Sequence, residues 1–127
     1  MTLNRRLLQF TLAALLLALP ALPALAHHGW GGNEGAEFEM TGTLVTAVSL
    51  AGPHATMQIK DKDGKVWDVT LAPAPRTDSA GLKETTIPLG ATVMVHGHRN
   101  RDQKKLEIKT ERVTWNGKVF NVYPDRT

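Results

Sequence analysis

The amino-acid sequence predicts an all-β fold, a small OB-like Greek-key barrel of five to six strands that follows an N-terminal signal peptide. Apolar and polar residues alternate in several stretches after residue 37, which is typical of strands with one buried face. Clusters of Gly, Pro, Asn and Asp separate these stretches and predict turns. A segment without alternation, 72–87, lies between the third and fourth stretches, where an OB barrel has its helical connection.

The first 26 residues have the features of a signal peptide. Arg5 and Arg6 give a positive start, an apolar stretch spans 7–19, and 24–26 (ALA) matches a small-x-small cleavage site. The apolar stretch is shorter than the roughly 20 residues that a transmembrane helix needs. We therefore expect cleavage after Ala26, a periplasmic location and no transmembrane span in the mature form. The paired arginines leave both the general and the twin-arginine export routes open.

The basic excess of the chain belongs mostly to this leader. All 12 acidic residues follow Ala26, whereas Arg5 and Arg6 precede it, so the charge falls from +3 to +1 on cleavage. A nucleic-acid partner, which a strongly basic domain would suggest, is therefore not expected. The sequence contains no cysteine, which excludes disulfides and thiolate metal sites.

The mature chain divides into a short arm and one domain. Residues 27–36 contain four glycines and few side chains to bury, so we expect a flexible His/Gly-rich arm. Residues 37–127 then form the OB-like barrel, because this length suits one domain and is too short for two. The oligomeric state stays open.

Three strands are expected before the interruption. Their inward-facing residues follow a period of two: Phe38, Met40, Leu44 and Val48 in the first strand, Ala55, Met57 and Ile59 in the second, and Trp67, Val69 and Leu71 in the third. The segment 61–65 (DKDGK) predicts a hairpin between the second and third strands, with Gly64 in a left-handed conformation.

The elements after the third strand begin with one or two helical turns over 76–82. Residues 92–98 predict the fourth strand, with Val93, Val95 and Gly97 facing the core, and the fifth strand begins near Leu106. The apolar parity then changes between Ile108 and Val113, which predicts a bulge near Glu111. Asn116-Gly117 predicts a tight turn. A short final strand follows, in which these residues are expected to pack on the barrel: Val119, Phe120 and Val122.

Several short motifs in this order resemble one family of exported bacterial proteins. They are "HHGW" at the mature start, "TGTLVTAVSLAGPHATMQIKDKDGKVWDV", "GLKETTIPLGATVMVHGHRN" and "NGKVF". Together they resemble the family catalogued as domain of unknown function 6152, over nearly all of 27–122. This chain departs from the family pattern at Gly29-Trp30, where Ser-Phe is usual, and at Gly52, where Asn is usual. The resemblance implies a small exported barrel and no established activity.

The histidines predict a site for a divalent metal ion. Cleavage after Ala26 gives His27 a free α-amino group that can chelate a metal together with its own imidazole and with His28. His96 and His98 lie two residues apart on one strand, so both point to the same face. Imidazole suits copper(II), zinc and nickel, and copper(II) is the tightest binder of the divalent series. We expect copper(II) at His27 and His28, with His54, His96 or His98 contributing; merely solvated histidines are the alternative.

A second reading assigns the chain a metal-independent role in recognising a ligand or an envelope protein. OB barrels often bind along the face of the second and third strands. Small and polar residues are expected to line that face here: Thr56, Gln58, Asp68 and Thr70. No nucleophile elbow or paired carboxylates can be placed in a pocket from the sequence, so we expect a binding protein rather than an enzyme.

Overall fold

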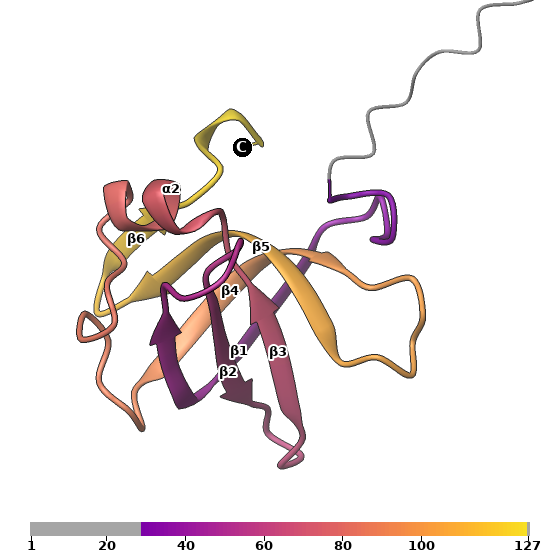
Figure 1. Cartoon of the computed structure of the whole chain (residues 1–127). Coiled ribbons are helices and arrows are strands. Elements are labelled where there is room, and N and C mark those ends of the chain that lie inside the picture. Colours follow the sequence, from indigo (N-terminus) through magenta and orange to yellow (C-terminus); the bar gives the residue numbers. More distant parts are fainter. Residues whose placement is uncertain (1–28, 127) are drawn as a thin grey trace, which may run out of the picture.

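A computed structural model describes residues 29–126 of the chain (Figure 1). Within this range the chain forms six strands, one α-helix and one 3-10 helix: β1 (Phe38–Ser49), β2 (Thr56–Lys60), β3 (Val66–Thr70), α2 (Ala74–Ser79), β4 (Thr92–Arg99), β5 (Glu107–Trp115), β6 (Lys118–Asn121) and η1 (Pro124–Arg126). Strands β1 to β5 close into a barrel and β6 extends it, which confirms the predicted all-β, OB-like fold. The predicted signal peptide, 1–26, lies outside the described residues.

The strands follow the order of an OB barrel. Antiparallel ladders join β3 to β2, β2 to β1, β1 to β4 and β4 to β5, and a parallel ladder between β3 and β5 closes the barrel. The first half of β1 pairs with β4, and its second half, from Thr43 onward, pairs with β2. Gly42 lies where β1 changes partner, and a Cβ there would come within 2.8 Å of the Lys60 carbonyl oxygen. Glycine at this position therefore allows the two strands to approach closely.

The core consists mainly of side chains that the alternation predicts to face inward, and the segment between β3 and β4 adds three that it did not predict, Ala72, Leu82 and Ile87. All the predicted inward residues of the second and third strands are buried: Ala55, Met57, Ile59, Trp67, Val69 and Leu71. In β1, Leu44 and Val48 are buried, whereas Phe38 and Met40 are partly buried and pack against the core. The sequence therefore predicted correctly which face of β1, β2 and β3 is covered.

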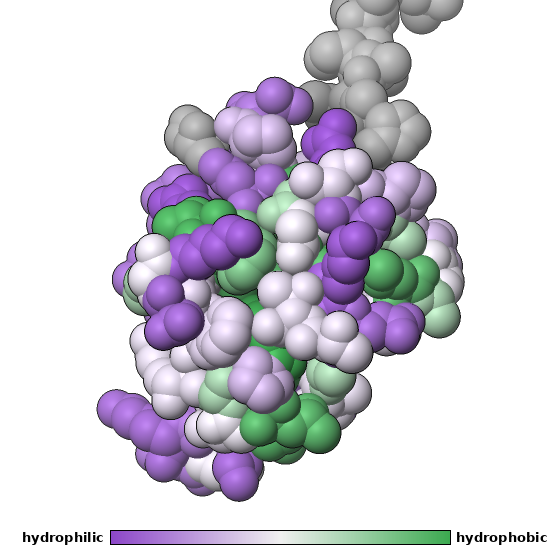
Figure 2. Space-filling model, turned by 90° about the vertical axis from the view of Figure 1, so that its left-hand side faces the viewer, coloured by the Kyte–Doolittle hydropathy of each residue, from purple (hydrophilic) through white to green (hydrophobic). Residues whose placement is uncertain are grey.

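Val119 is an exception, since its predicted packing on the barrel is wrong. Its side chain is 54% exposed, whereas Phe120 and Val122 are buried. Successive residues of a strand point to opposite faces, so burying Phe120 turns Val119 outward. Figure 2 shows the hydrophobic surface of one face of the molecule as separate areas among hydrophilic residues.

The turns and the helix follow from Gly, Asn and Pro positions. Asn116 (φ 51°) and Gly117 (φ 74°) connect the paired residues Trp115 and Lys118, which confirms the predicted tight turn. Helix α2 starts at Ala74 rather than at the predicted residue 76. Pro75 lies in the first turn of this helix, where a residue without an N–H is tolerated, so it does not delay the helix start.

A bulge in β5 shapes the region of the candidate site. His96 pairs with Arg112 and the next residue, Gly97, pairs with Thr110, so Glu111 is the extra residue of the ladder. The bulge predicted near Glu111 is therefore confirmed. A Cβ on Gly97 would collide with the backbone of β5 at Lys109 and Thr110. The two strands thus lie too close for a side chain beside the bulge, at a position where β4 has none.

Residues 29–36, the described part of the predicted arm, contact the barrel. Asn33 forms an isolated bridge with Asn100, and its side-chain amide donates to the His98 carbonyl oxygen at 2.9 Å. The Trp30 ring meets the rings of His98 and Tyr123 edge to face, with centroid distances of 5.5 and 5.1 Å. The glycine content of this segment did not predict these contacts. No helix within residues 29–126 is long and apolar enough to cross a membrane.

Candidate metal centre

The three described histidines lie in two different places. His96 and His98 both come from β4 and both reach toward Glu111 of β5. His54 lies in the loop before β2 and lines a separate pocket. His27 and His28 lie outside the described residues, so their role as metal ligands stays a prediction.

Glu111 provides a buried carboxylate, with only 1% of the residue exposed. Its Oε1 atom lies 2.8 Å from His98 Nε2 and accepts a hydrogen bond of 3.1 Å from Arg126 Nε. Its Oε2 atom is also buried, but it has no hydrogen-bond partner among the described residues. Burying a carboxylate oxygen without a partner costs free energy, because the oxygen loses its hydration. A cation bound at Oε2 would remove this cost.

His98 supports Glu111 and has no nitrogen left for a metal. Its Nδ1 atom lies 3.0 and 3.1 Å from the carbonyl oxygens of Glu34 and Ala36, and its Nε2 atom faces Glu111. Both ring nitrogens therefore already face oxygen atoms of the protein. The geometry makes His98 a positioning residue for the Glu111 carboxylate.

The ring of His96 lies between carboxylates. Nδ1 lies 3.2 Å from Glu39 Oε2, and Nε2 lies 3.2 Å from Glu37 Oε2. The contact of Nε2 has no hydrogen-bond geometry, and this buried nitrogen has no other partner in the described residues. A neutral imidazole carries only one N–H and can donate to only one carboxylate. The second nitrogen then presents its lone pair to a negative oxygen unless a proton or a metal cation lies between them.

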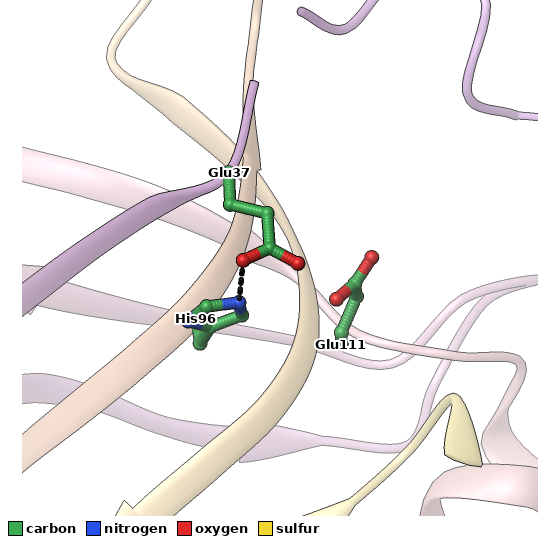
Figure 3. A group of neighbouring side chains, drawn as sticks. All are labelled: Glu37, His96 and Glu111. Atoms are coloured by element: carbon green, nitrogen blue, oxygen red, sulfur yellow. Dashed lines mark ion pairs between the residues drawn. The ribbon is translucent and has the colours of Figure 1, made fainter. Parts of the chain in front are cut away.

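Three side chains converge in front of His96. One ligand atom each from Glu37, His96 and Glu111 lies within 4.8 Å of the others. Figure 3 shows the Glu37 carboxylate next to the His96 ring, with the Glu111 carboxylate to the side of both. Glu37 is exposed, His96 is partly buried and Glu111 is buried, so the group is open to solvent on one side. We call these three residues the Glu–His–Glu cluster. One imidazole and two carboxylates form a mixed nitrogen and oxygen donor set that suits zinc, copper(II) and other divalent transition metals.

His54 lies in a pocket whose charged side chains, Arg76 and Lys109, are both basic. The pocket has a volume of about 440 Å³, and its lining includes Gly29, Trp30 and Lys109. Partial burial and the positive charge of Lys109 lower the pKa of His54. The structure thus does not bring His54 together with His96 and His98, as one shared metal site would require.

The four residues of the predicted ligand face line one pocket on β2 and β3. This pocket has a volume of about 330 Å³, and its lining includes Thr56, Gln58, Asp68 and Thr70. Gln58 links the face through hydrogen bonds, since its Nε2 donates to Asp68 Oδ1 at 2.8 Å and its Oε1 accepts from Thr46 Oγ1 at 2.7 Å. The outward parity of these residues was correctly predicted from the alternation.

Sequence reasoning missed the two glutamates of the cluster. Glu37 and Glu111 lie 59 and 15 residues from His96 in the sequence, so only the pairing of β1 and β5 with β4 brings them together. The parity change did locate the bulge at Glu111, and bulges often redirect a side chain near a functional site. That signal could have marked Glu111 as a candidate ligand.

Comparisons with known proteins bear on the fold alone. No protein-family model and no curated protein matches the sequence. The structure is similar to a chain of the S. pombe Stn1–Ten1 complex, with a TM-score of 0.50 and 16% identity over 62% of this chain and 57% of that chain. It also resembles apo TiaS, a tRNA agmatidine synthetase, with a TM-score of 0.48 and 18% identity over 62% of this chain and 18% of that chain.

The chain thus spans little more than half of the Stn1–Ten1 chain and a fifth or less of TiaS. At such low identity the Stn1–Ten1 likeness supports the OB-like barrel and says nothing about ligands. The resemblance to the family catalogued as domain of unknown function 6152 stays a prediction.

Proposed function

We propose that this chain is an exported, periplasmic protein whose OB-like barrel binds a divalent metal ion at the Glu–His–Glu cluster. The observations that carry the proposal are the convergence of Glu37, His96 and Glu111 and the buried Oε2 of Glu111, which lacks a hydrogen-bond partner among the described residues. Export rests on the predicted leader, 1–26, which ends shortly before the barrel.

The contacts of Glu111 match those of a supported metal ligand. Ligating carboxylates in metal sites are usually held by hydrogen bonds from a second layer of residues. His98 and Arg126 hold Oε1 of Glu111 in this way and leave Oε2 for an ion.

Copper(II) and zinc are the ions that we propose first. Copper(II) is the tightest binder in the divalent series, and zinc accepts imidazole and carboxylate ligands in tetrahedral sites. The predicted chelate at His27 and His28 is a second, separate proposal, because both histidines lie outside the described residues. Two proposals at different positions can be tested one at a time.

An N-terminal alanine placed before His27 separates the two metal sites. This extension removes the amine of His27 from the chelate and leaves the barrel unchanged. Calorimetric titration of the extended protein with zinc or copper(II) should therefore show one remaining site. If the extension leaves copper(II) affinity and stoichiometry unchanged, the chelate at His27 is wrong.

Substitutions in the extended protein then test the cluster itself. Glu111→Gln keeps the shape of the side chain but removes the charge that faces the ion, and we expect the affinity of the remaining site to fall at least ten-fold. Glu84→Gln is the matched control, since it removes the same charge from an exposed side chain that is not part of the cluster, and its effect should stay within about three-fold. Equal affinity of the Glu111→Gln variant and its parent, both folded by circular dichroism, would exclude the cluster as the site.

The pocket on β2 and β3 supports a second candidate function, the metal-independent recognition of a ligand or an envelope protein. Its lining of hydroxyl, amide and carboxylate groups suits polar partners. A pull-down from periplasmic extract, with and without chelator, separates the two functions. Partners that survive chelation and are lost in a Gln58→Ala variant favour the β2–β3 pocket.

A further inference from the structure

The pocket beside Trp30 has a basic character that the metal proposal does not use. Its lining residues include Trp30, His54, Arg76, Lys109 and Tyr123, and no acidic residue is among them. The pocket has a volume of about 440 Å³, which is room for a small molecule. We call it the basic pocket.

Lys109 is the most unusual residue of this pocket. It is only 6% exposed, and within residues 29–126 its ammonium group forms no hydrogen bond or ion pair. Its Nζ lies 4.9 Å from the centre of the Trp30 ring and against the backbone of Gly29, where a Cβ would collide with it. Lysine is rarely buried without a partner, because the ammonium loses its hydration.

Two more positive groups lie near this pocket: Arg76 lines it, and Arg126 lies against the Trp30 ring, one of its walls. Arg76 lies over the Tyr123 ring, 5.4 Å from its centre, and forms no ion pair within the described residues. Arg126 lies 4.0 Å from the centre of the Trp30 ring. Burial, and then the repulsion from Arg126, lower the pKa of Lys109. Two cations without acidic partners thus face one pocket, and an anion there would relieve both the lost hydration and the repulsion.

We propose that the basic pocket binds the anionic group of a small molecule, a phosphate or a carboxylate, with Lys109 and Arg76 contacting the anion. Trp30 and Tyr123 form partly apolar walls that can cover the uncharged part of such a ligand. The proposal is independent of the metal site, because neither Lys109 nor Arg76 contacts the Glu–His–Glu cluster in any described interaction.

Thermal unfolding in the presence of inorganic phosphate or acetate, against chloride at equal ionic strength, tests this proposal. At ten times the dissociation constant, the anion should raise the Tm by about 7 °C. The Lys109→Met variant should lose this rise. It should also fold at least as stably in chloride, because methionine fills the same space without a buried charge.

Lys104→Gln is the matched control, since it removes the same charge from an exposed position, and it should keep the full rise. Glu111→Gln should keep it as well, which separates this proposal from the metal site. A rise with phosphate alone identifies phosphate as the ligand group, and an equal rise with acetate extends the ligands to carboxylates. A rise of the same size in Lys109→Met, or no rise above chloride in the parent, would overturn the proposal.

Discussion

At the scale of single residues, Glu111 and Gly97 both lie at the β-bulge where β4 pairs with β5. The bulge makes Glu111 the extra residue of β5, and Gly97 lies opposite it without a side chain. His98 and Arg126 then compensate the burial of the Glu111 carboxylate. The tripeptide His96-Gly97-His98 therefore combines a candidate ligand, a close backbone contact and a residue that positions Glu111.

Replacing Gly97 by alanine should destabilise the barrel strongly. A Cβ at this position would collide with the backbone of Lys109 and Thr110, so β4 and β5 would have to separate. We expect the free energy of unfolding to fall by about 2 kcal/mol or more, as measured by urea denaturation. Gly32→Ala is the control: a Cβ there meets nothing within 4 Å, and the change should stay within about 0.5 kcal/mol. Equal losses for the two variants would contradict the close approach at Gly97.

Only part of the arrangement around His96 and His98 could be predicted from the sequence. The spacing of His96 and His98 predicted a shared side of the strand, and both do reach toward Glu111. Their different roles were not predictable, because the carbonyl groups of Glu34 and Ala36 that occupy His98 come from a distant segment. Glu37 and Glu111 are remote from His96 in the sequence, and only the pairing of the strands brings them close to it.

At the scale of elements, the β2–β3 hairpin depends on Asp61. Its carboxylate accepts hydrogen bonds of 2.9 Å from the Trp67 indole and from the backbone N–H groups of Asp63 and Lys65. The Trp67 bond is the largest cause of a pKa below the ordinary value of 3.8, followed by the backbone bond from Lys65. The side chain thus fixes the turn and joins it to a buried residue of β3.

Asp61→Asn should reduce the dependence of stability on pH. Because folding lowers the pKa of Asp61, its stabilising contribution is complete above the ordinary value and is lost as pH falls through the folded-state pKa. The Tm of the variant should therefore lie below that of the parent at pH 7, and the difference should narrow between about pH 5 and pH 2. Asp63→Asn, in the same turn, should follow the parent. A difference that stays constant over this range would rule out the proposed role of the Asp61 charge.

Elements were predictable where local patterns determine them. Alternation located the strands, and Asn116-Gly117 and Gly64 located two turns, because these signals act within a few residues. The start of α2 was misplaced because a proline ends a strand and begins a helix equally well. The contacts of 29–36 depend on Trp30 packing against His98 and Tyr123, which no local pattern indicates.

At the scale of the whole molecule, the first and last described segments meet around Trp30. Its ring contacts His98 of β4, Tyr123 after β6 and Arg126 of η1. Arg126 also bonds to Glu111, so these segments connect the basic pocket with the surroundings of the Glu–His–Glu cluster. The basic pocket and the Glu–His–Glu cluster thus both lie near the segments that precede β1 and follow β6.

The most direct test of the metal proposal is a crystal structure of the mature protein soaked in zinc, with anomalous diffraction measured at the zinc edge. We predict an anomalous peak about 2.0–2.2 Å from His96 Nε2 and from one oxygen each of Glu37 and Glu111. A peak only at the N-terminal histidines, or no peak near Glu111 in crystals that bind zinc elsewhere, would contradict the account.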